Sequence, residues 1–77
     1  MIIMSNSLTE SELEFIISRV IKNAEDAVEE SKNDSSAFLD GKKLAYYEIL
    51  DTIRNELVVR EIDLKRFGLD IVLEELL

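Results

Sequence analysis

The sequence predicts an all-α protein, an antiparallel two-helix hairpin with a short C-terminal tail that dimerises into a four-helix bundle. Three observations lead to this expectation. The 77 residues contain no proline and two glycines, a composition that favours uninterrupted helices. Two long segments carry apolar residues at helical spacing. The polar segment 31–36 separates them, and a short connection between long helices places the two helices antiparallel.

The first helix is expected from about residue 9 to residue 31. Thr9, followed by Glu12 three residues later, matches a capping box, and Ser7 with Glu10 is a second possible start. The apolar stripe of this helix comprises Leu13, Ile16, Ile17, Val20, Ile21, Ala24, Ala27 and Val28.

Acidic residues crowd the C-terminal part of this helix. They are Glu25, Asp26, Glu29 and Glu30, and they oppose the preference of the helix dipole for positive charge at this end. Two interpretations stay open: a solvated face, or a site for a cation or a basic partner.

The second helix is expected from about residue 35 to residue 60, with Asp34 or Ser35 as its N-terminal cap. Gly41 lies at the edge of its apolar stripe. Glycine costs a helix about 1 kcal/mol relative to alanine, so we expect another helix to approach closely there. The alternative is that Asp40 and Gly41 form a turn and the helix begins after them.

The tail is expected over residues 61–77. Residues 62–67 predict one helical turn that ends at Gly68 as the C′ residue, and Leu69–Leu73 predicts an extended apolar run. Together the segments form a single helical domain over residues 1–77.

A second copy is expected because both apolar stripes are wider than a two-helix contact requires. Further apolar residues project away from the stripes, and we expect the tail to cover them: Leu8, Phe15, Leu44, Tyr47 and Val58. The residues expected in the core or at the dimer contact are Ile16, Val20, Ala24, Gly41, Ala45, Tyr46, Ile49, Ile53 and Leu57.

Composition excludes several chemistries. The chain has no cysteine and no histidine, which removes thiolate nucleophiles, the commonest general base and the commonest transition-metal ligand. The net charge of −8 opposes binding to nucleic acid or to anionic membranes. Residues 1–4 are apolar but too short for a membrane span or a signal sequence. A cytoplasmic protein without a cofactor is therefore expected.

One set of acids resembles a known site. Glu25, Asp26, Glu29, Glu48 and Asp51 match the EExxE…ExxD pattern of all-α (MazG-like) nucleotide pyrophosphatases. The resemblance implies that these carboxylates bind Mg²⁺, which suits oxygen-only ligands. However, a turn near residue 33 separates Glu29 from Glu48 by roughly 15 Å along the hairpin, and only a turn at Asp40-Gly41 would align them.

A second resemblance covers about half of the chain. The run Phe38…Gly41-Lys42…Ala45-Tyr46-Tyr47-Glu48-Ile49-Leu50-Asp51…Ile53 and the tail Phe67-Gly68-Leu69-Asp70 resemble small helical proteins of Gram-positive bacteria, some in phage or mobile-element settings. This resemblance implies a helical hairpin and carries no activity or ligand.

The role expected from all these features is protein–protein interaction, as a homodimeric adaptor or regulator. The alternatives are the Mg²⁺-dependent pyrophosphatase and an inhibitor whose acidic surface mimics nucleic acid.

Overall fold

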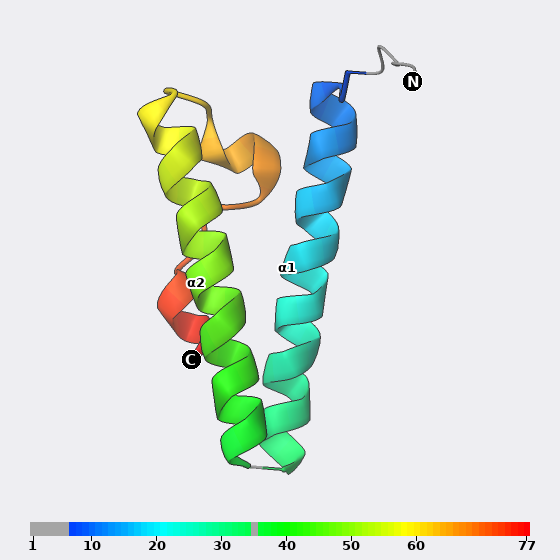
Figure 1. Ribbon diagram of the computed structural model, residues 1–77, viewed down its shortest axis with the longest axis vertical. Coiled ribbons are helices and arrows are strands. Elements are labelled where there is room, and N and C mark those ends of the chain that lie inside the picture. The colour runs from blue at the N-terminus through cyan, green and yellow to red at the C-terminus, as the bar shows by residue number, and fades with distance from the viewer. Residues whose placement is uncertain (1–6, 35) are drawn as a thin grey trace, which may run out of the picture.

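The computed structural model describes residues 7–34 and 36–77 and shows two long helices that run antiparallel (Figure 1). Helix α1 spans Glu10–Asn33 and helix α2 spans Ala37–Val59. Two short 3-10 helices follow, η1 at Leu64–Phe67 and η2 at Leu73–Leu76. No strand occurs among the described residues. The expected all-α hairpin is confirmed.

A capping box begins α1. The backbone N–H of Glu12 donates to Thr9 Oγ1 at 3.1 Å, and the N–H of Thr9 donates to Glu12 Oε1 at 2.8 Å. These reciprocal bonds satisfy two donors that a helix start otherwise leaves without a partner. The cap predicted at Thr9 is therefore confirmed.

The start of α2 differs from the prediction in its capping residue. Ser36 is the N-cap, and its Oγ accepts the N–H of Leu39 at 3.2 Å. Asp34 ends α1 as its C-cap, with φ of −154° and ψ of 99°, and Ser35 lies outside the described residues. Beyond this point α2 continues without a break through Asp40 and Gly41, so the alternative of a turn at these two residues is wrong.

The two helices converge at their connection and diverge toward their other ends, where η1 lies between them (Figure 1). Ala24 and Ala27 are 1% and 0% exposed, which permits close approach near the connection. Gly41 does not contribute to it, because a Cβ added there meets no heavy atom within 4 Å. The expected close approach at Gly41 is therefore absent from the single chain.

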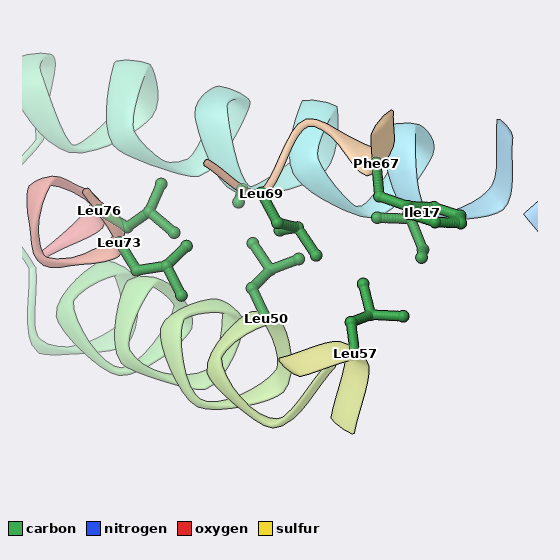
Figure 2. Close-up of a cluster of buried hydrophobic side chains, with 8 residues drawn as sticks. Ile17, Leu50, Leu57, Phe67, Leu69, Leu73 and Leu76 are labelled. Atoms are coloured by element: carbon green, nitrogen blue, oxygen red, sulfur yellow. The ribbon is translucent and has the colours of Figure 1, made fainter. Parts of the chain in front are cut away.

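The tail completes the core of the single chain. Phe67, Leu69, Leu73 and Leu76 are 4%, 0%, 0% and 8% exposed. Figure 2 shows these side chains gathered with Ile17 of α1 and with Leu50 and Leu57 of α2. These buried contacts hold the tail between the two diverging helices.

This path corrects the expectation that the tail covers the outer apolar residues. The residues that stay exposed are Leu8, Phe15, Leu44 and Val58, at 64%, 64%, 47% and 53%. Tyr47 is the exception: it packs against the core, and its hydroxyl donates to Glu74 Oε2 at 3.4 Å. The physical reason is geometric, because the diverging inner stripes leave a gap that the tail leucines fill.

Candidate interaction surfaces

One side of the hairpin is apolar, and no other segment of residues 7–34 and 36–77 covers it. We call it the open face and define it by seven residues: Leu13, Ile16, Val20, Ala45, Ile49, Ile53 and Ile62. A groove of about 440 Å³ runs along it between the two helices. A second hollow of about 370 Å³ continues the groove along α2, and the two share Thr52 and Ile53.

The open face results from the width of the two apolar stripes. The tail leucines pack against the inner half of the two stripes, and the described residues leave the outer half of each stripe uncovered. Ile16 is 46% exposed and Ile49 is 49% exposed. An apolar groove flanked by half-exposed isoleucines is the kind of patch that marks an association surface.

The nine residues expected in the core or at the dimer contact divide into groups. Ala24 and Leu57 are buried in the core. Val20, Tyr46 and Ile53 are half-buried and pack against it. The remaining residues are exposed in the single chain: Ile16, Gly41, Ala45 and Ile49.

A second surface lies between α1 and the tail. We call it the tail groove; its volume is about 520 Å³ and it is lined by Lys22, Glu25, Asp26, Val28, Glu29, Ile71, Val72, Glu75 and Leu76. Its apolar floor includes Ile71 and Val72, which are 40% and 58% exposed. The sequence indicated the acidic residues of α1 but not this groove, because its floor comes from the tail.

Two ion pairs neutralise part of the negative charge at the rim of the tail groove. Lys22 Nζ lies 2.9 Å from Asp26 Oδ1, and Lys32 Nζ lies 2.9 Å from Glu29 Oε2. The hydrogen bond to Asp26, aided by the negative charge of that carboxylate, raises the pKa of Lys22 above its usual value. Glu25 and Glu75 form no ion pair within the described part of the chain, so their charge faces solvent.

The five acids that resemble a pyrophosphatase site are divided between the two helices. Glu25, Asp26 and Glu29 lie on α1, whereas Glu48 and Asp51 lie on α2. Across residues 7–34 and 36–77, no group of three or more acidic side chains is arranged to hold a metal ion. Asp51 instead accepts hydrogen bonds from Arg54 at 2.9 Å and from Asn55 at 3.4 Å. The site that this resemblance implies is therefore not formed in the described residues.

Comparisons with protein families, with curated proteins and with solved structures find no match to this chain. No helix within the described residues is long and apolar enough to cross a membrane.

Proposed function

We propose that this protein acts through protein–protein interaction and that its open face joins two copies into a four-helix bundle. In this arrangement the α1–α2 face of one hairpin packs on the same face of the other. Such a contact is isologous, because each residue of the face meets the same face of the partner. The role that follows is that of a homodimeric adaptor or regulator, without catalysis.

One observation carries the proposal. Ile16 and Ile49 lie on different helices, and each keeps about half of its surface exposed beside the groove. Transfer of apolar surface out of water contributes about 25 cal/mol per Å². Pairing two open faces removes this surface from water on both copies at once. The tail cannot do so, because its buried leucines already occupy the other side of the gap.

Charges border the open face without interrupting it. Glu56 and Arg60 line the groove and form an ion pair of 2.6 Å with each other. Glu48 lies at the edge of the second hollow. Interfaces commonly have an apolar centre and a polar rim, and the open face has this arrangement.

Sedimentation equilibrium at micromolar concentration tests the proposal with two lysine substitutions on α2. Ile49→Lys places a charge in the centre of the open face. Val58→Lys is the matched control, because Val58 is 53% exposed and lies outside that face. Burying an unpaired ammonium costs several kcal/mol, so we expect Ile49→Lys to weaken dimerisation by about 100-fold or more.

The unchanged protein and Val58→Lys should both sediment as dimers, and Ile49→Lys should sediment as a folded monomer. Circular dichroism confirms that each variant retains its helices. A monomeric unchanged protein would contradict the proposal. A dimer that Ile49→Lys leaves intact would place the contact on another surface.

A further inference from the structure

We infer that the tail groove binds a basic amphipathic segment of another protein. This segment has apolar side chains on one side, which lie on the groove floor, and lysine or arginine side chains along its edges. The inference goes beyond the proposed dimer, because it concerns a different surface and a different partner.

The floor of the tail groove is apolar and held in place. Ile71 and Val72 are exposed, yet Leu69, two residues before Ile71, and Leu73, directly after Val72, are both 0% exposed. The N–H of Glu75 donates to the carbonyl of Val72 at 3.1 Å and fixes the backbone as η2 begins. Two apolar side chains are thus presented to solvent by a segment that is anchored at both ends. A partner gains their burial without ordering this segment first.

The rim determines the charge of the partner. Four acids line the groove, Glu25, Asp26, Glu29 and Glu75, and Lys22 is the single base that lines it. Lys22 is engaged by Asp26, and Glu25 and Glu75 are without an ion pair in the described chain. Such a rim attracts lysine and arginine and repels phosphate groups.

The acids of α1 add to the charge of the rim. Glu25 and Asp26 lie about two turns before the end of α1 at Asn33. Glu29 lies about one turn before that end, where Lys32 pairs with it at 2.9 Å. A second copy of the chain is a poor occupant, because it brings a net charge of −8 to an acidic rim.

The tail groove and the open face lie on opposite sides of α1. Glu29 follows Val20 by about two and a half helical turns at 100° per residue, which places the two side chains on opposite faces. A dimer formed through the open face therefore leaves both tail grooves free. Binding to the tail groove does not require the dimer, so the two proposals fail independently.

A synthetic peptide tests the inference with the full-length chain. The probe is an amphipathic helix of leucine and lysine with its leucines on one side, and fluorescence anisotropy measures its affinity. One control peptide has the same composition in a scrambled order, so that its leucines share no face. A second control has glutamate in place of lysine. We expect the first peptide alone to bind. In NMR spectra of the protein, the chemical shifts that this peptide perturbs should be those of Val28, Ile71 and Val72.

Two pairs of matched variants locate the contact. Val72→Ser should weaken binding by about fivefold, whereas Val58→Ser, at a similarly exposed valine of α2, should change it less than about twofold. Glu25→Gln should weaken binding and reduce its dependence on salt, whereas Glu48→Gln on α2 should do neither.

Three results would overturn the inference. The scrambled peptide could bind as tightly as the amphipathic one, which would show that binding depends on net charge alone and not on the apolar floor. The chemical shift perturbations could map to the open face instead of the tail groove. Finally, Val72→Ser could dissociate a dimer in sedimentation equilibrium, which would show that a second copy occupies the groove.

Discussion

Within the part of the chain that the structure describes, Glu61 and Gly68 adopt a left-handed backbone, and each ends a helix. Glu61 has φ of 59° and Gly68 has φ of 71°. After α2, the N–H of Ile62 donates to Leu57 O and the N–H of Glu61 donates to Val58 O, both at 2.9 Å. This pair of bonds is the Schellman motif, which places a left-handed residue at the C′ position. Glycine occupies this conformation without a steric penalty, but glutamate does not.

We therefore expect Glu61→Gly to stabilise the protein by about 1 kcal/mol, since it removes the strain of a side chain at positive φ. Urea denaturation monitored by circular dichroism measures the change. Gly68→Ala is the reciprocal test: a Cβ there lies 3.5 Å from Ile21 Cδ1, an ordinary contact, so strain alone should destabilise the protein by about 1 kcal/mol. Changes of the same sign in both variants would contradict this account.

At the scale of whole elements, Gly41 weakens α2 without a packing benefit in the single chain. It lies inside the helix, and a Cβ added there meets nothing within 4 Å. Gly41→Ala should therefore raise the free energy of unfolding by about 1 kcal/mol through helix propensity alone. Thermal denaturation measures it, and sedimentation should show an unchanged mass. A loss of stability accompanied by dissociation would instead restore the close helix approach that the sequence suggested.

The hydrogen bond from Tyr47 of α2 to Glu74 of the tail depends on pH. The negative charge of Glu74, together with burial of the ring, raises the pKa of Tyr47 above its usual value. The folded state thus keeps the phenol proton to higher pH than the unfolded chain, in which the pKa of tyrosine is about 10. The stability that Tyr47 contributes is complete below this pH and is lost as pH rises through the folded-state pKa.

Tyr47→Phe should therefore reduce the loss of stability at alkaline pH. Urea denaturation of both proteins at pH 8 and at pH 11 measures the difference. Both proteins keep Tyr46, so the comparison isolates Tyr47. An equal loss of stability in the two proteins between these pH values would show that Tyr47 does not cause the alkaline loss.

The helices could be predicted because their signals are local. Thr9 and Glu12 satisfy each other within one turn, and Gly68 ends η1 as expected. The path of the tail could not be predicted in the same way. It depends on how far α1 and α2 diverge, which is a property of long-range packing. A usable signal was present in Leu69, Leu73 and Leu76, whose spacing of four and three residues places apolar side chains toward one side.

At the scale of the molecule, the tail decides how much apolar surface remains for a partner. The sequence predicted two stripes too broad for one hairpin, and the tail covers part of the excess from one side. The open face remains, with Ile16 and Ile49 half exposed. The tail groove could not be foreseen, because Ile71 and Val72 reach α1 only when the tail folds back between the helices.

The tail also determines whether a chain of 77 residues has a sufficient core. Leu73 is 0% exposed, so Leu73→Ala should lower the free energy of unfolding by about 2–5 kcal/mol, through lost burial and the cavity left behind. Leu77→Ala is the control in the same tail, because Leu77 is 55% exposed and should lose less than about 1 kcal/mol.

Urea denaturation at one fixed protein concentration measures both variants, since dimerisation makes apparent stability depend on concentration. The dependence of the unfolding free energy on urea concentration measures the surface that unfolding exposes. If the tail and the helices unfold together, the slope of the unchanged protein should fit the surface exposed by the whole chain. Equal and small losses in Leu73→Ala and Leu77→Ala would show that the tail is an appendage, and that the hairpin must obtain its stability from the open face and a second copy.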